Sequence, residues 1–263
     1  MERIMQISID GVNIRYDIYG DKGTRVLLLH GWGCDATHMK PVAEDLQRDH
    51  QVIAVDFPGH GGSDRPPEPW GVPEYADCLR KMLERLSFIP CSVVAHSFGC
   101  RVAAYLASLD DKLFSRIVFT GAAGIRPKQT EEGKRRNDEF QKKKAFWNKI
   151  KKFVLFRFFA EKAEEKLRKK YGSADYNALD EEMRKTFVRV INMDLSDCYR
   201  KIRQSTLLIW GDKDDATPLW MGQMMEKEIP DAGLVVFENA THFAYLEQIG
   251  RFNTIVSHFL TEE

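Results

Sequence analysis

A serine stands where a short apolar run turns into a helical pattern, in the segment SVVAHSFGCRVAA (residues 92–104). A strand that becomes a helix within so few residues forces the residue at the turn into a strained backbone conformation, and such positions are usually kept for chemistry. The side chain at the turn lies at the C-terminal edge of the sheet, next to the N-terminus of the following helix. We therefore expect Ser97 to be a nucleophile.

A serine hydroxyl is a weak nucleophile, so it needs a general base, and the base needs a carboxylate that orients it. His242, in the segment ENATHFAYLEQ, follows the last apolar run and so lies at the same sheet edge as Ser97. Isolated histidines are more often structural than catalytic, and this location singles out His242 as the predicted base. The other six histidines are His30, His38, His50, His60, His96 and His258.

The acid should follow a neighbouring strand at the same edge. The segment LLIWGDKDDATP supplies Asp212, Asp214 and Asp215 directly after an apolar run. We select Asp214 as the acid and expect Asp212 to organise the turn. The candidate triad then has the chain order Ser97, Asp214, His242.

The oxyanion that forms on a carbonyl substrate needs preorganised hydrogen-bond donors, and losing one costs on the order of 10²–10³ in rate. The backbone N–H of Phe98, directly after the nucleophile, is one predicted donor. The motif HGWG follows the apolar run 25–31 and brings the N–H of Trp32 to the same edge as the second. The glycines of this motif let the backbone approach closely.

The chain must form a sheet that positions these residues. Its N-terminal segment MQISIDGVNIRYDIYG predicts a β-hairpin that turns at Asp10-Gly11. Apolar runs that suit buried parallel strands occupy residues 25–31, 51–57, 91–97, 114–121, 205–211 and 232–240. Helical patterns occupy residues 38–49, 74–86, 98–109, 219–229 and 253–262. This alternation predicts an α/β fold with a doubly wound, mostly parallel sheet.

One interval, residues 125–196, contains only helix-period material. We interpret it as a helical cap over the C-terminal edge of the sheet, where open α/β sheets bind ligands. The predicted core is then made of residues 1–124 and 197–263. Part of an apolar helix face in the cap should form the wall of a substrate pocket, together with two histidines of the core. The predicted pocket residues are His30, His96, Phe146, Trp147, Ile150 and Phe153.

The predicted cap is also strongly basic. Residues 126–170 hold 17 Lys/Arg and 7 Asp/Glu, whereas the whole chain has a formal net charge of zero. One interpretation is a solvated helical surface. The other is attraction to an anionic partner, such as an acidic carrier protein, a membrane surface or an acidic substrate.

Together, the serine joint and the motifs HGWG, DFPGHGGSD, GDKDDATP and ATHF resemble the α/β-hydrolase superfamily, in that family's order. The resemblance covers about residues 1–124 and 197–263 and implies the hydrolase fold and its triad; the cap matches only in position. The HGWG loop and the AHSFG turn are most similar to small bacterial carboxylesterases, including the pimeloyl-carrier-protein methyl esterase group. In those enzymes the residue that matches Trp32 donates to the oxyanion.

Three positions depart from the family pattern. Ala95 replaces the first glycine of G-x-S-x-G, and we expect its single methyl group to be tolerated. Cys100 stands where glycine is common, and we expect it to pack rather than react. Asp215 stands where proline is common, which leaves the choice between Asp214 and Asp215 open.

Composition excludes several classes of protein. A net charge of zero argues against nucleic-acid binding by the whole protein. No stretch approaches the roughly 18 apolar residues of a membrane span, and no spacing of metal ligands or cofactor motif is present. The N-terminal MERIMQISID lacks the apolar region of a signal peptide. With five scattered cysteines and no CxxC pair, we expect a reduced, cytoplasmic protein without cofactor or metal.

The remaining chemistry is acyl transfer by a serine. Related dehalogenases and epoxide hydrolases use an aspartate nucleophile, and the HGGPG-like loop of proline iminopeptidases is missing. We expect hydrolysis of a small-molecule carboxylic ester or thioester with an apolar or aromatic acyl portion. Two alternatives stay open: carbon–carbon bond hydrolysis of a dienoate-type diketone by the same triad, and a ligand-binding receptor on a hydrolase scaffold.

Overall fold

The computed structural model describes residues 3–125 and 179–261, with a few isolated positions between them: residues 135, 138, 139, 142, 143, 176 and 177. The chain divides into two compact units, residues 1–125 with 188–263 and residues 126–187. The first unit contains the sheet. Most of the predicted cap lies outside the described residues, so the cap stays a prediction; helix α7 (Glu181–Asn192) is described within that interval.

The N-terminal hairpin is present as predicted. Strands β1 (Arg3–Ile9) and β2 (Val12–Tyr19) pair antiparallel. They are joined at Asp10 and Gly11, whose φ angles are 49° and 84°. Two positive φ angles in a two-residue loop match the right-handed twist of the flanking strands, and glycine adopts the second without strain.

Six further strands continue the sheet in parallel, which confirms the predicted fold class. The sheet has the order β1-β2-β4-β3-β5-β6-β7-β8, and β4 joins β2 antiparallel. The parallel strands are β3 (Thr24–Leu29), β4 (His50–Val55), β5 (Cys91–His96), β6 (Phe114–Thr120), β7 (Thr206–Gly211) and β8 (Ala232–Phe237). The middle strands are buried on both faces, which explains why they are continuous apolar runs rather than alternating ones.

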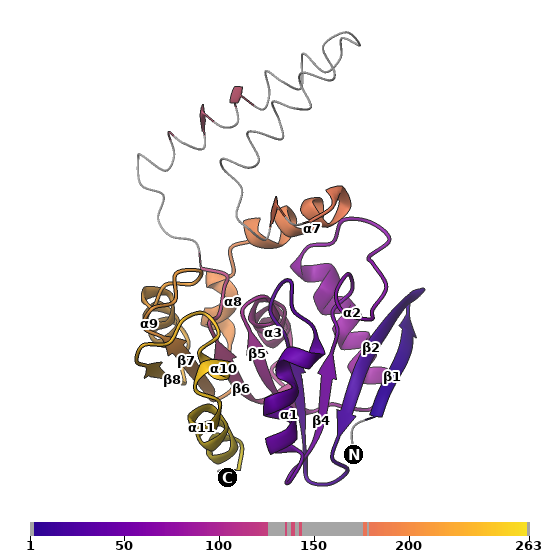
Figure 1. Cartoon of the computed structure of the whole chain (residues 1–263), viewed down its shortest axis with the longest axis vertical. Coiled ribbons are helices and arrows are strands. Elements are labelled where there is room, and N and C mark those ends of the chain that lie inside the picture. The colour runs from indigo at the N-terminus through magenta and orange to yellow at the C-terminus, as the bar shows by residue number, and fades with distance from the viewer. Residues whose placement is uncertain are drawn as a thin grey trace. The chain divides into compact units, whose positions relative to one another are not determined.

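Helices cover both faces of this sheet (Figure 1). Side chains such as Leu27 and Val93 belong to the cluster of one face, whereas Val26 and Val94 belong to the other. The first face packs against α2 (Val72–Arg85), α3 (Phe98–Leu109), α8 (Ser196–Lys201) and α9 (Trp220–Glu228). The second packs against α1 (Lys40–Leu46) and α11 (Ile249–Thr261). Short turns at Ala36–Met39 and α10 (Ala244–Glu247) complete the unit.

Two helix boundaries differ clearly from the predicted ones. The predicted helix 38–49 is a 3₁₀ turn followed by α1, which begins at Lys40 with Pro41 in its first turn. A proline fits the first turn of a helix because its missing N–H would be unpaired there in any case. The last helix begins at Ile249, four residues earlier than the 253 expected from its apolar periodicity.

The start of α3 lies very close to β3. The N–H of Gly99 donates to the carbonyl oxygen of His30 at 3.1 Å. A Cβ at Gly99 would lie 2.7 Å from the carbonyl oxygen of Leu29 and 2.8 Å from its Cβ. The helix that follows Ser97 can therefore approach the neighbouring strand only because this position has no side chain.

The close packing at Gly99 predicts that Gly99→Ala lowers the free energy of unfolding by about 1–3 kcal/mol, because the added methyl group meets backbone that cannot move away. The measurement is urea denaturation followed by circular dichroism. Gly250, in the first turn of α11, is the matched control because a Cβ there would meet nothing within 4 Å. Gly250→Ala should raise the free energy of unfolding by up to about 1 kcal/mol. Equal effects at both positions would contradict the packing account.

Candidate active site

Ser97 occupies a strained turn between β5 and α3. Its backbone has φ 50° and ψ −103°, which is outside the regions that residues with a side chain usually adopt. Such a conformation costs about 1–3 kcal/mol and persists only where the surroundings hold it. The Ser97 N–H donates to the carbonyl oxygen of Thr120 at 3.1 Å. Ser97 is partly exposed although every other residue from Cys91 to Cys100 is buried.

The two residues predicted to supply oxyanion donors lie together beside Ser97. Phe98 is the first residue of α3, and its ring packs edge-on against the Trp32 ring with the centroids 5.2 Å apart. The HGWG loop runs directly against the serine turn, since a Cβ at Gly31 would lie 3.3 Å from the Ser97 Cβ. The oxyanion role of the Trp32 and Phe98 N–H groups stays a prediction.

The acid and the base come from the loops after β7 and β8. The Nδ1 atom of His242 lies 2.8 Å from Oδ2 of Asp214. The Asp214 side chain is completely buried, while that of His242 is 17% exposed. Asp212 and Asp215 are both exposed. Among the three aspartates of the loop, Asp214 is the one that the structure brings to His242.

Hydrogen bonds hold the Asp214 carboxylate in one orientation. Oδ1 accepts from the N–H groups of Ala216 and Thr217 at 3.0 and 2.8 Å. Oδ2 accepts from the hydroxyl of Thr217 at 2.8 Å. Burial acts to raise the pKa of Asp214, but the hydrogen bond and charge of His242 and the Thr217 donors outweigh it, so its pKa lies below its ordinary value. Asp214 is thus an ionised, fixed acceptor.

Gly121, which the sequence patterns did not single out, makes room for this pair at the end of β6. Its φ of 53° favours glycine. A Cβ there would lie 3.1 Å from Nδ1 of His242 and 3.3 Å from Oδ2 of Asp214. The only signal in the sequence is a glycine that ends the apolar run FSRIVFTG.

His30 and His96, predicted as pocket residues, are 0% and 1% exposed. Nε2 of His30 accepts from the Phe57 N–H at 3.0 Å, and its Nδ1 lies 2.7 Å from the Gly31 carbonyl oxygen. Nδ1 of His96 lies 3.1 Å from the Thr120 carbonyl oxygen. Burial lowers the pKa of both histidines to about 3, so both are neutral. These contacts give both histidines a role in holding the loops around Ser97.

His96 also touches the predicted base. Its ring centroid lies 4.7 Å from that of His242 and 5.0 Å from that of Phe243. Phe243 is 36% exposed beside the base. A neutral ring next to His242 adds no repelling charge when His242 becomes protonated.

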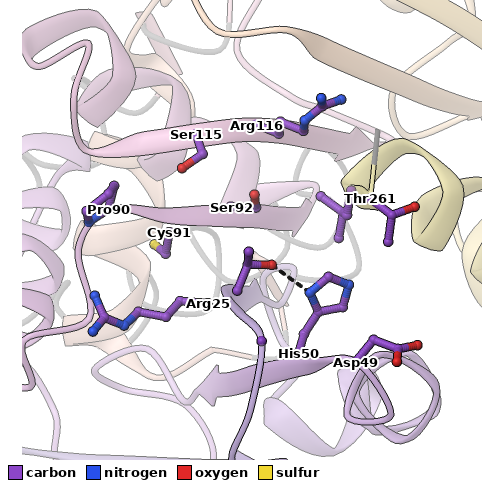
Figure 2. Close-up of a pocket in the computed structure, with 12 residues that line it drawn as sticks. Arg25, Asp49, His50, Pro90, Cys91, Ser92, Ser115, Arg116 and Thr261 are labelled. Atoms are coloured by element: carbon purple, nitrogen blue, oxygen red, sulfur yellow. Dashed lines mark hydrogen bonds between the residues drawn. The ribbon is translucent and has the colours of Figure 1, made fainter. Parts of the chain in front are cut away.

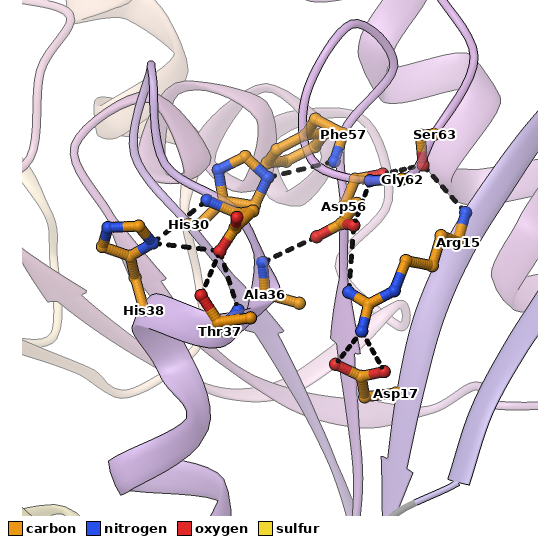
Figure 3. A network of polar contacts seen from close by, with 11 residues as sticks. Arg15, Asp17, His30, Ala36, Thr37, His38, Asp56, Phe57, Gly62 and Ser63 are labelled. Carbon is orange, nitrogen blue, oxygen red and sulfur yellow. Dashed lines mark hydrogen bonds and ion pairs between the residues drawn. The ribbon is translucent and has the colours of Figure 1, made fainter.

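A buried charged network joins the turn Ala36–Met39, which follows the HGWG loop, to the DFPGHGG loop (Figure 3). The Asp56 carboxylate, which is 0% exposed, accepts from the Ala36 N–H at 2.6 Å and the Gly62 N–H at 2.8 Å. Arg15 on β2 donates to Asp56 at 3.0 Å and also binds both oxygens of Asp17. Removing one partner of such a buried pair leaves an uncompensated charge, so these loops depend on the network.

Ala95 and Cys100, two of the positions that depart from the family pattern, are both buried. Ala95 is fully buried within β5. Cys100 is also fully buried, and its thiol lies 3.0 Å from the Ala95 carbonyl oxygen. Burial raises the pKa of the Cys100 thiol, so it is not a thiolate at neutral pH.

A cavity of about 680 Å³ lies at the opposite edge of the sheet, where the parallel strands begin (Figure 2). Thr24 and His50 are hydrogen-bonded there at 2.7 Å. Arg25 and Arg116 each donate to a backbone carbonyl, of Ile89 at 3.1 Å and of Phe259 at 2.7 Å. None of the candidate catalytic residues lines this cavity. The predicted pocket residues Phe146, Trp147, Ile150 and Phe153 lie outside the described residues.

Within residues 3–125 and 179–261, no three His, Cys, Asp or Glu side chains are grouped so that they could hold a metal ion. Among the same residues, no helix has the length and hydropathy of a membrane span.

Comparison with known proteins assigns the family. The model of the alpha/beta hydrolase fold matches residues 24–248. The chain belongs to the α/β-hydrolase family. It is 25% identical over 250 residues to the pimeloyl-[acyl-carrier protein] methyl ester esterase of Chromobacterium violaceum, which covers 92% of this chain and 96% of that protein.

Solved structures agree on the fold. The esterase EaEST from Exiguobacterium antarcticum superposes with a TM-score of 0.74 at 21% identity and covers 100% of both chains. The meta-cleavage product hydrolase CumD from Pseudomonas fluorescens IP01 superposes with a TM-score of 0.72 at 23% identity, covering 97% of both chains. At these identities the superpositions establish the fold alone.

The buried neutral histidines predict how stability depends on pH. The unfolded chain binds protons at His30 and His96 below the ordinary pKa of 6.5, whereas the folded chain does so only near 3. Stability should therefore fall as pH falls from about 6.5 towards 3, by up to about 1.4 kcal/mol per pH unit for each histidine. His96→Asn should flatten this slope in urea denaturation.

The control for this prediction is His258→Asn, since His258 is exposed on α11. The control should keep the slope of the wild-type protein. If His96→Asn also kept the full slope, the folded protein would have to protonate His96 over the same pH range as the unfolded chain does. That result would contradict the prediction.

Proposed function

We propose that this protein is a serine hydrolase that cleaves a carboxylic ester or thioester through an acyl-enzyme, with Ser97 as nucleophile, His242 as base and Asp214 as acid. The observation that carries the proposal is the 2.8 Å contact between His242 and the buried, fixed Asp214, at the same sheet edge as the strained, partly exposed Ser97. The similarity to a methyl ester esterase supports the choice of bond.

In the first half of the proposed reaction, Ser97 Oγ attacks the ester carbonyl carbon while Nε2 of His242 takes the hydroxyl proton. The backbone N–H groups of Trp32 and Phe98 bind the resulting oxyanion. As the tetrahedral intermediate collapses, His242 gives its proton to the leaving alkoxide or thiolate. Asp214 remains ionised and stabilises the imidazolium without taking the proton.

In the second half, a water molecule replaces the leaving group. His242 takes one proton from this water as its oxygen attacks the acyl carbon. Collapse of the second intermediate breaks the bond to Ser97 Oγ, which recovers a proton from His242. The products are the carboxylic acid and the alcohol or thiol.

The same proposal places the enzyme in the cytoplasm, where its five free cysteines stay reduced.

Ser97→Ala should abolish hydrolysis of p-nitrophenyl esters from acetate to dodecanoate, with kcat falling by about 10⁴-fold or more because no nucleophile remains. The chain-length optimum of the wild-type protein then measures the acyl pocket, which we propose to be apolar from the cap sequence. The assay is release of p-nitrophenolate.

Ser92→Ala is the matched control, because Ser92 lies on the same strand but lines the cavity at the opposite edge. This variant should keep wild-type turnover, and both variants should melt cooperatively. Turnover that survived in Ser97→Ala would remove the serine from the mechanism. A folded wild-type protein that binds esters without turning them over would instead be a receptor.

A second candidate reaction is hydrolysis of a carbon–carbon bond in a dienoate-type diketone. A meta-cleavage product hydrolase shares this fold, so the fold is compatible with this reaction as well as with ester cleavage. Loss of ultraviolet absorbance from a ring-fission product distinguishes it from ester cleavage, since an esterase leaves this chromophore unchanged.

We further propose that an acidic carrier protein presents the acyl group. The excess of lysine and arginine in residues 126–170 supports this proposal, as does the carrier-linked substrate in the name of the Chromobacterium relative.

The carrier proposal predicts that kcat/KM for a carrier-linked ester falls steeply with salt, by about tenfold or more between 50 and 500 mM NaCl, because salt screens attraction between the two proteins. The value for a free p-nitrophenyl ester should change little. Equal salt dependence of the two substrates would contradict the proposal.

A further inference from the structure

Thr217 follows the predicted acid by three residues and lies inside the loop after β7. It is 5% exposed. Its carbonyl oxygen accepts from Nε1 of the buried Trp210 at 2.6 Å, which fixes the Thr217 backbone against the end of the strand. The Thr217 hydroxyl is therefore held in place by the core.

The Thr217 hydroxyl contacts both partners of the acid–base pair. Its Oγ1 lies 2.8 Å from Oδ2 of Asp214 and 3.3 Å from Nδ1 of His242. The His242 Nδ1 lies 2.8 Å from the same Oδ2. Three polar atoms thus form a closed triangle, and the positions of their protons decide what each can do.

Counting protons gives one favourable arrangement. A hydroxyl has one proton and two lone pairs, and an ionised carboxylate can only accept. When the Thr217 proton points to Asp214, a lone pair of Oγ1 faces His242. Nδ1 of His242 must then carry the proton, which it shares between Asp214 and Thr217. Nε2 is left as the unprotonated nitrogen that a general base needs.

The opposite arrangement is unfavourable. If the proton of His242 were on Nε2, the hydroxyl of Thr217 could satisfy Nδ1 only by turning away from Asp214. Oδ2 of a buried carboxylate would then lose both of these donors, which costs free energy in the protein interior.

We propose that Thr217 is a positioning residue whose hydroxyl holds the Asp214 carboxylate in the orientation in which Oδ2 accepts from Nδ1 of His242. This inference rests on the proposed function, in that Asp214 and His242 serve as acid and base. Thr217 touches neither the substrate nor the serine in this proposal, and it acts only through the other two side chains.

The test compares Thr217→Val with Thr217→Ser. Valine keeps the branched shape and the N–H donor to Asp214 but removes the hydroxyl, whereas serine keeps the hydroxyl. Thr217→Val should lower kcat for a p-nitrophenyl ester by about tenfold, with KM within about twofold, because the loss falls on a step after binding. Thr217→Ser should recover kcat to within about threefold of the wild-type protein.

Thr206→Val is the matched control for removing a buried threonine hydroxyl. Thr206 is 3% exposed on β7, and its hydroxyl donates to the Gln204 carbonyl oxygen at 2.9 Å. It touches no candidate catalytic residue, so Thr206→Val should change stability but not kcat. Thr217→Ala, which removes the hydroxyl without adding bulk, is measured alongside in case the valine variant does not fold.

A second readout reports the hydrogen bond between His242 and Asp214 directly and needs no turnover. In protein labelled with ¹⁵N-histidine, the Nδ1 proton of His242, assigned with His242→Gln, should be shifted downfield in the wild-type protein because it is donated to Asp214. This downfield shift should be smaller in Thr217→Val and Thr217→Ala, and Thr217→Ser should restore it.

A wild-type Nδ1 proton shift and wild-type kcat in both hydroxyl-deleted variants would overturn the proposal for Thr217. So would a Thr217→Ser variant as impaired as Thr217→Val. Failure of the proposed function has a different signature, namely turnover that survives Ser97→Ala. The Nδ1 proton shift still decides the role of Thr217 in that case.

Discussion

Helix α3 packs so closely on β3 that Gly99 has no room for a side chain, and this contact holds the turn at Ser97. The Gly99 N–H bonds to His30, and the Ser97 N–H bonds to Thr120 on the other neighbouring strand. Between these two hydrogen bonds Ser97 takes φ 50° and ψ −103°. The packing of both neighbouring strands offsets this backbone strain. The turn exposes the Ser97 hydroxyl at the edge of an otherwise buried segment.

The acid–base pair depends on a different part of the sheet. Asp214 lies in the loop after β7, and His242 lies in the loop after β8. Because these two strands are parallel neighbours, both loops lie at the C-terminal edge of the sheet. His30 and His96 at this edge are buried and uncharged at neutral pH. The ionised Asp214 carboxylate contacts His242 directly.

Much of this arrangement could be predicted from the sequence, because parallel strands, tight turns and a serine joint have local patterns. The eight strands and the choice of Asp214 depend on apolar runs and on residues that directly follow them. The Asp56 network could not be predicted, since Arg15 and Ala36 meet Asp56 only through the order of the strands. The same holds for Thr217, whose partner His242 is 25 residues away. The prediction of His30 and His96 as pocket residues used sequence position alone and did not include their burial.

The most direct test of the central claim is covalent labelling with a fluorophosphonate, followed by mapping of the modified peptide by mass spectrometry. A serine hydroxyl that is activated by a neighbouring base attacks the phosphorus atom of the probe, displaces fluoride and stays covalently bound to the probe. An ordinary serine does not react. The account predicts one adduct per chain, on Ser97, with labelling much slower in His242→Gln. A fast adduct on another residue, or no adduct in a protein that hydrolyses esters, would contradict it.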